Sequence, residues 1–170
     1  MIQDIIKGIN RISTIIYSRY NKIKFYTYGN QLSICRNATI KGPVYIRLRK
    51  TGKLIIGNNF YCVSGCCYNP IARNIRTSFC TEENAVIEIG DNVGISSSSI
   101  RAFERITIGN NVNIIIDSDA HSLNYEDRRD GTLDKQNRKS RPIVIEDDVL
   151  IGTRSIILKG VTVSLEQVLL

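Results

Sequence analysis

The sequence predicts a mainly β fold in which short strands wind into a three-walled coil, with a helical segment in front of it. Three observations lead to this prediction: apolar residues recur six positions apart, Gly, Asn or Asp follow them, and the first residues show helical spacing. The composition agrees, because Trp is absent and aromatic residues make up only 7% of the chain. Short strands rich in isoleucine suit a narrow core of this kind.

The period of six is clearest in residues 144–163, which read VIEDDVLIGTRSIILKGVTV. Ile145, Ile151, Ile157 and Val163 lie six positions apart. Strand alternation or a helical period does not produce this repeat, whereas a coil does if each hexad forms one wall and its first apolar residue, the anchor, points inward. The same step links Ile56 to Cys62, Ile89 to Ile95 and Ile108 to Ile114, and a second inward position follows four residues after an anchor at Phe60, Val93, Val112, Val149, Ser155 and Val161.

The spacing of the anchors predicts how the chain is organised. Between Ile56 and Ile89, and again between Ile108 and Ile145, the interval is longer than one turn of three hexads. We therefore expect excursions from the coil near residues 68–83 and 119–141. The predicted parts are a helical, basic segment at 1–30, the coil at 31–163 and a short tail at 164–170. Gly, Asn and Asp after the anchors are expected to supply the backbone angles of the corners. A sandwich of ordinary strands is the alternative fold.

The N-terminal segment combines helical spacing with positive charge. Residues 1–53 hold eleven Lys or Arg and a single acidic residue, Asp4, so this part should attract an anionic partner. The helix is expected to cap the coil or pack on a neighbour, or else to lie peripherally on an anionic membrane surface. Asp4, Lys7 and Arg11 interrupt any apolar run suited to secretion or to membrane spanning. The isoleucines at helical spacing are Ile2, Ile5, Ile6, Ile9, Ile12, Ile15 and Ile16.

The cysteines do not predict a metal or redox site. Their number is odd, no CxxC pair occurs, and His121 is the only histidine, so a zinc site of the common kind is not expected. Free, reduced thiols fit a cytoplasmic protein. Nucleic acid is not an expected partner, because no aromatic and basic module is present. The five cysteines are Cys35, Cys62, Cys66, Cys67 and Cys80.

Several stretches together resemble one protein family. IGDNVGIS at 89–96, IGNNVNII at 108–115 and IEDDVLIGTRSIILKGVTV at 145–163, with DSDAH at 117–121, resemble the hexapeptide-repeat acyltransferases. The nearest branch contains the galactoside and maltose acetyltransferases and the O-acetyltransferases of bacterial surface polysaccharides. The resemblance covers about residues 54–163. It implies a left-handed parallel β-helix with a long excursion loop, a homotrimer, and acetyl-CoA bound between neighbouring coils.

The resemblance also implies a catalytic role for His121. An acetyl group would move from a thioester to a sugar hydroxyl, and an imidazole can remove the hydroxyl proton and return it to the departing thiolate. Asp119 is expected to orient the imidazole or to bind the acceptor, and Asp117 is a second carboxylate that could orient the ring. The alternative is that His121 is an ordinary surface residue.

Four further residues are expected at the site by alignment with the family. Ser96 stands where the resembled enzymes carry an acceptor-binding asparagine, and a serine hydroxyl can still bind the acceptor sugar. Gly152, Thr153 and Lys159 are expected to border acetyl-CoA. Gly152 can equally be a corner residue of the coil.

The function expected from these features is acetyl-CoA-dependent O-acetyl transfer to a carbohydrate in surface polysaccharide biosynthesis, in the cytoplasm and at the inner face of the membrane. The family pattern continues beyond KGVT with a further coil, whereas this chain reads VSLEQVLL after it. The alternative is therefore a non-catalytic or impaired β-helical scaffold that binds polyanions and lacks the C-terminal cofactor wall.

Overall fold

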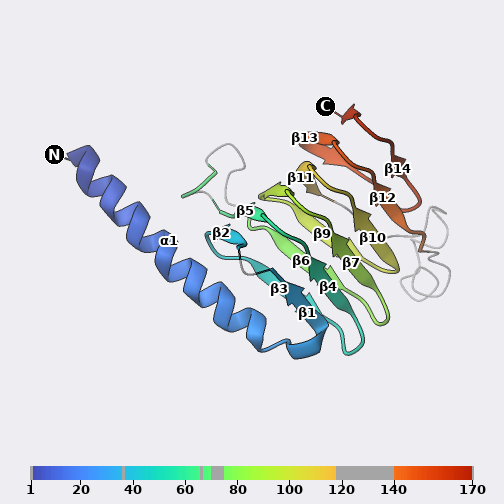
Figure 1. Ribbon diagram of the computed structural model, residues 1–170, viewed down its shortest axis with the longest axis horizontal. Helices are drawn as coiled ribbons and strands as arrows, with labels where there is room; N and C mark the ends of the chain where they lie inside the picture. The colour runs from blue at the N-terminus through green and yellow to red at the C-terminus, as the bar shows by residue number, and fades with distance from the viewer. Residues whose placement is uncertain (1, 36, 66, 70–74, 118–139, 170) are drawn as a thin grey trace, which may run out of the picture.

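A computed structural model describes residues 2–35, 37–65, 67–69, 75–117 and 140–169 (Figure 1). Within them the protein is mainly β, with parallel sheets and one long helix, which confirms the coarse prediction. The elements are α1 (Ile2–Tyr26), the 3-10 turn η1 (Gly29–Gln31), β1 (Leu32–Ile34), β2 (Thr39–Lys41), β3 (Tyr45–Leu48), β4 (Lys53–Ile56), β5 (Tyr61–Val63), β6 (Ser78–Thr81), β7 (Val86–Ile89), β8 (Gly94–Ser96), β9 (Ser99–Ala102), β10 (Arg105–Ile108), β11 (Asn113–Asp117), β12 (Ile143–Ile145), β13 (Leu150–Ile156), β14 (Thr162–Val163) and β15 (Val168–Leu169).

Strands pair in parallel with the strand three elements further along up to β11 and two elements further along after that, which arranges them in three columns. The first column is β1-β4-β7-β10-β12-β14, the second is β2-β5-β8-β11-β13-β15, and the third is β3-β6-β9. β11 joins the second and third columns, because Ile114 pairs with Ile95 of β8 while Asp117 pairs with Ser99 of β9. Figure 1 shows the strands stacked as successive rungs, with α1 beside the first of them.

The residues predicted to point inward form the core, with one exception. Every anchor of a hexad is buried, and so are the second positions at Phe60, Val93 and Val112. The exception is Val161, which is 39% exposed. The prediction is wrong there because Gly160 adopts a φ of 81° and the Val161 N–H bonds back to Leu158 O, so a turn replaces the wall position.

The corners use asparagine and glycine for two different reasons. Asn59, Asn92 and Asn111 each follow an anchor by three residues and have φ between 55° and 58°, a left-handed conformation that asparagine tolerates better than most residues. Gly90 is needed for close approach instead, since a Cβ there would lie 2.7 Å from the carbonyl oxygen of Gly109 on the next turn. The expectation that corner residues supply unusual angles is therefore confirmed for asparagine but wrong for this glycine.

Side-chain amides and carboxylates tie neighbouring corners together. Asp91 Oδ1 accepts the Asn58 backbone N–H at 2.6 Å, and the Asp91 N–H donates to Asn110 Oδ1 at 2.8 Å. One residue further along, Asn92 Oδ1 accepts from Asn59 Nδ2 at 2.8 Å. The two bonds of Asp91 satisfy backbone donors at corners, where the strand ladders end, and the bond between Asn59 and Asn92 joins the side chains of successive corners.

Two boundaries differ from the predicted ones. Residues 78–81 form β6, which pairs in register with β3, so they belong to the third column rather than to the first excursion. Val168 and Leu169 form β15 and pair with Leu150 and Ile151 of β13, so the segment expected as a tail extends the second column. Most of the second excursion, residues 118–139, lies outside the described residues. Among the helices that are described, none combines the length and apolar character that crossing a bilayer requires.

Replacing a corner glycine tests the close approach of the turns. We expect Gly90→Ala to lower the free energy of unfolding by about 2–4 kcal/mol, because the new methyl group overlaps backbone that cannot move aside cheaply. Urea unfolding followed by circular dichroism measures the change. Gly8→Ala is the matched control: a Cβ at this position of α1 meets nothing within 4 Å, so the variant should be as stable as the wild type or more stable. Equal stability of both variants would contradict the packing proposed for the corner.

Candidate functional site

Four consecutive serines form the corner between β8 and β9. Ser97 adopts a φ of 47° and is buried, and the Ser98 hydroxyl donates to the backbone oxygen of Ser96 at 2.8 Å. The Ser99 hydroxyl lies 2.9 Å from that of Ser78 on the neighbouring turn. Small side chains that bond to nearby backbone groups allow the chain to turn sharply here. We call residues 96–99 the serine corner.

Ser96, a residue expected to bind the acceptor, makes a contact that the sequence did not predict. Its hydroxyl oxygen accepts a hydrogen bond of 2.6 Å from Nδ2 of Asn69, and the Ser96 side chain is half-buried. Asn69 comes from the segment that leaves the coil after β5. An amide carbonyl and a hydroxyl placed together can accept from and donate to a sugar hydroxyl, or donate to an oxyanion. No repeat or motif marks Asn69, so only its place in an excursion could have suggested a role.

The chain enters its second excursion next to the serine corner. Asp117, the last residue before the excursion, pairs in register with Ser99. His121 and Asp119, the predicted base and its partner, lie in residues 118–139 and so outside the described residues. The structure therefore places the beginning of their segment, and their roles remain predictions.

The predicted cofactor residues lie on β13 and just after it. The pairing of β11 with β13 jumps from Ile114–Ile151 to Ile116–Ser155, so a bulge holds Gly152 and the two residues after it. The Ser155 hydroxyl donates to Gly152 O at 3.1 Å. The side chain of Thr153 lies outside the described part.

Lys159 follows Gly152 by seven residues and is half-buried in the turn before β14, beyond the wall that carries the bulge. The structure thus brings Gly152 into the same column as Ser96, whereas Lys159 lies at the following corner. Gly160, beside it, has the left-handed φ of a corner residue, and a Cβ there would lie 3.1 Å from Arg141 Cδ.

A second polar cluster lies on the third column. Glu82 Oε1 accepts from Arg101 Nη2 at 2.6 Å, and Arg47 and Arg49 lie within 3.6 Å of the same carboxylate. The hydrogen bond from Arg101 is the main cause that holds the pKa of Glu82 below its usual range. Three guanidinium groups around one carboxylate leave an excess of positive charge, which suits an anionic partner. We call these four residues the arginine cluster.

Cys35, Cys62 and Cys80 are free thiols and are buried or half-buried, as the sequence predicted, whereas Cys67 is exposed. Cys62 is fully buried, and burial raises the pKa of its thiol to about 12. Burial likewise raises the pKa of Cys80. A thiol must lose its proton to act as a nucleophile, so Cys62 serves as a core residue. Among the described residues, no three His, Cys, Asp or Glu side chains are grouped so that they could hold a metal ion.

The buried thiol of Cys62 should make stability depend on alkaline pH. Below about pH 9 the thiol is protonated in both states and contributes no pH dependence. Between about pH 9 and about pH 12 it ionises only in the unfolded chain, so the free energy of unfolding falls by about 1.4 kcal/mol per pH unit. Urea unfolding of the wild type and Cys62→Ala at about pH 8 and about pH 10 measures this difference.

We expect Cys62→Ala to cost about 1–3 kcal/mol at the lower pH, because it leaves a cavity, and clearly less at the higher pH. Val93→Ala is the matched control, since it also shortens a buried side chain but removes no ionisable group. Its cost should be the same at both pH values. A cost of Cys62→Ala that also stays constant would show that the thiol ionises equally in both states.

Comparison of the chain with protein-family models, with curated proteins and with solved structures gives no match.

Proposed function

We propose that the protein is an acetyl-CoA-dependent O-acetyltransferase that acetylates a sugar hydroxyl during surface polysaccharide biosynthesis, as for a capsule or O antigen. In this proposal the columns of strands form a left-handed parallel β-helix of the hexapeptide-repeat type. One observation supports the proposal most: the segment that carries His121 starts beside the serine corner, because Asp117 pairs with Ser99. Ser96 and Asn69, which suit an acceptor sugar, lie at the same corner.

In this proposal each site residue has a separate role in the reaction. His121 takes the proton of the attacking hydroxyl and returns it to the thiolate that leaves, for which an ordinary histidine pKa near ~6.5 is suitable. Asp119 fixes the orientation of the imidazole or binds the acceptor. Ser96 and Asn69 hold the acceptor, and much of the acceleration comes from holding the two reactants together. No covalent intermediate is needed, which agrees with the inert thiol of Cys62.

Acetyl-CoA supplies the activated acetyl group as a cosubstrate. The bulge at Gly152 fits the extended pantetheine arm, because an interrupted strand ladder offers backbone groups to an amide ligand. Thr153 and Lys159 would border the same molecule. The proposal includes a homotrimer, in which the cosubstrate lies between neighbouring subunits, and a location in the cytoplasm at the inner face of the membrane.

Substitution of His121 tests the proposed base. We expect His121→Ala to lower the rate of CoA release from acetyl-CoA, with a suitable sugar acceptor, by about 10²–10⁴-fold, since general base catalysis is worth about that much. A thiol-reactive dye follows the CoA released. The variant should keep the circular dichroism spectrum and the acetyl-CoA affinity of the wild type. Equal turnover of both proteins would remove His121 from the mechanism.

Substitution of Asn69 tests the acceptor site. Asn69→Ala should raise KM for the sugar acceptor about tenfold, in keeping with the loss of one hydrogen-bonding group, while KM for acetyl-CoA stays unchanged. Steady-state kinetics with each substrate varied in turn separates the two effects. Asn30→Ala, in the exposed turn η1, is the matched control and should leave both values unchanged. If Asn69→Ala raised only KM for acetyl-CoA, the serine corner would border the cosubstrate and not the acceptor sugar.

The arginine cluster favours a second candidate function, a scaffold that binds polyanions. Arg47, Arg49 and Arg101 are each 40% to 54% exposed at the side chain, so an anionic polymer can reach them. Salt-sensitive binding to such a polymer, together with no acetyl-CoA binding by calorimetry, would favour the scaffold over the enzyme.

A further inference from the structure

The helix α1 is attached to the coil through its polar face. Asn21 is buried, and its Nδ2 donates to Gly42 O at 2.9 Å. Lys24 Nζ donates to Val44 O at 3.0 Å, and the Tyr28 hydroxyl, just after the helix, donates to Ile46 O at 2.6 Å. Gly42 and Val44 lie in the segment between β2 and β3, and Ile46 lies in β3, which among the described strands pairs with β6 alone. The helix thus caps the first turn of the coil by supplying donors to these carbonyl groups.

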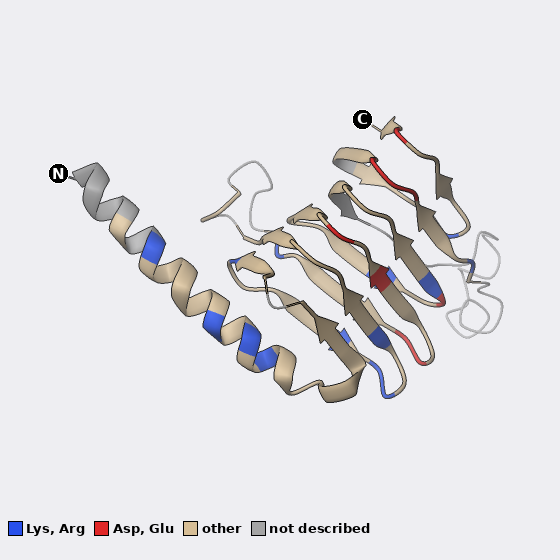
Figure 2. Cartoon of the chain, in the orientation of Figure 1, with Lys and Arg blue, Asp and Glu red and all other residues tan. Residues whose placement is uncertain are grey.

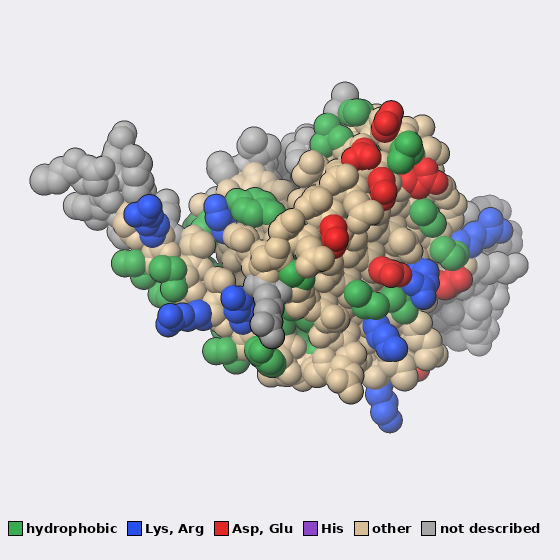
Figure 3. All heavy atoms as spheres, viewed as in Figure 1, with side chains coloured by type: hydrophobic (Ala, Val, Ile, Leu, Met, Phe, Trp, Pro, Cys, Tyr) green, Lys and Arg blue, Asp and Glu red, His purple; other side chains and the backbone are tan. Residues whose placement is uncertain are grey.

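These bonds fix which face of α1 points away from the protein. Asn21 and Lys24 lie three residues apart, hence on one side of the helix, and Phe25 next to them is buried in the core. The opposite side carries large apolar side chains that are 54% to 86% exposed. Figure 3 shows hydrophobic and basic side chains mixed on this surface. We call it the outer face of α1, and its apolar members are Ile12, Ile15, Ile16, Tyr20, Ile23 and Tyr26.

The outer face of α1 is also basic. Arg11, Arg19 and Lys22 are exposed on the same side of the helix as the isoleucines. No Asp or Glu occurs between residues 5 and 81, and Figure 2 shows basic residues along α1 and acidic residues only on later turns of the coil. The surface therefore combines apolar groups with uncompensated positive charge.

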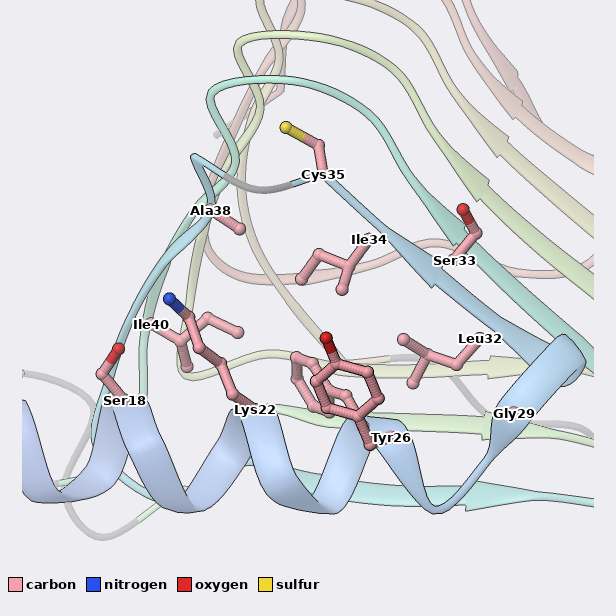
Figure 4. A pocket seen from close by; sticks show the side chains of 11 residues that line it. Ser18, Lys22, Tyr26, Gly29, Leu32, Ser33, Ile34, Cys35, Ala38 and Ile40 are labelled. Carbon is pink, nitrogen blue, oxygen red and sulfur yellow. The ribbon is translucent and has the colours of Figure 1, made fainter.

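A pocket with both polar and apolar lining residues continues this surface towards the coil. It lies between α1 and the first strands, has a volume of about 700 Å³, and is walled by Leu32, Ile34 and Ile40. Lys22 and Tyr26 border it, and Figure 4 shows both side chains on the helix facing the open end of the coil. Lys22 thus borders this pocket as well as the outer face of α1.

We propose that the outer face of α1 binds the surface of an anionic lipid bilayer, with the helix lying along it. The isoleucines would enter the boundary with the acyl chains, Tyr20 and Tyr26 would lie at the headgroup level, and the basic side chains would contact lipid phosphates. The charge argues against a second copy of α1 as the partner, because Arg11, Arg19 and Lys22 of two copies would repel one another. This inference goes beyond the proposed reaction and does not depend on it.

Vesicle cosedimentation of the full chain tests the proposal. The protein should bind vesicles of phosphatidylcholine with about 30% phosphatidylglycerol, should bind phosphatidylcholine alone far less, and should be released by salt. Arg11→Gln/Arg19→Gln/Lys22→Gln should lower the partition coefficient on anionic vesicles about a hundredfold, taking about fivefold for each charge. Ile16→Ser/Ile23→Ser should lower it at least about tenfold. Both variants change exposed side chains and should keep the circular dichroism spectrum of the wild type.

Matched substitutions on the coil serve as controls. Lys53→Gln and Ile55→Ser alter an exposed lysine and an exposed isoleucine of β4, and they should bind vesicles as the wild type does. Failure of the wild type to bind anionic vesicles would overturn the proposal, and so would equal losses from the coil and α1 variants. If sedimentation velocity showed instead that Ile16→Ser/Ile23→Ser dissociates an oligomer without changing vesicle binding, the partner would be a second copy.

The outcome can be separated from that of the enzymatic proposal. His121→Ala should bind anionic vesicles as the wild type does, whereas the α1 variants should keep full CoA release with a sugar acceptor in free solution. Loss of vesicle binding together with retained turnover, or the reverse, would therefore identify which of the two proposals fails.

Discussion

Successive turns of this coil stack at the distance of hydrogen-bonded strands, about 4.8 Å, and this distance governs what each position can hold. At Gly57 and Gly90 a Cβ would overlap the carbonyl of the next turn. Asn59 and Asn92 take the left-handed corner conformation and bond to one another across the turns. In the core between the columns of strands, branched side chains such as Ile89 are buried. The repeat of six therefore follows from one spacing applied turn after turn.

The same spacing restricts where a longer segment can leave the coil. Extra residues inside a wall would shift its register and turn the buried side chains outward, whereas a corner has no register to lose. Both excursions leave next to the third column, one after β5 and the other after Asp117. Asn69 of the first contacts Ser96, and the second begins beside Ser99. Two segments without repeats thus converge on one corner, and such segments on a rigid scaffold commonly carry function.

The sequence predicted those features that depend on local periodicity. Burial of the anchors follows from position within a hexad, so it could be derived without knowing the fold of any distant segment. The prediction for Val161 was wrong because its environment depends on the turn at Gly160 and on the hydrogen bond to Leu158 O, not on the repeat. The contact of Asn69 with Ser96 joins residues 27 apart through a segment that has no pattern. His121 was singled out by its place in the sequence, and its geometry lies outside the described residues.

The orientation of α1 shows why an amphipathic pattern alone does not assign an inner face. Spacing reveals that a helix has an apolar and a polar side, and the usual expectation turns the apolar side towards the protein. Here the interior is already filled by branched residues, while the segment that leads into β3 offers the carbonyl groups of Gly42 and Val44, which need donors. Asn21 and Lys24 supply those donors, so the polar side faces inward. Because the polar side of α1 bonds to the coil, the isoleucines of the outer face are exposed in the described part of the chain, as the proposed contact with a bilayer requires.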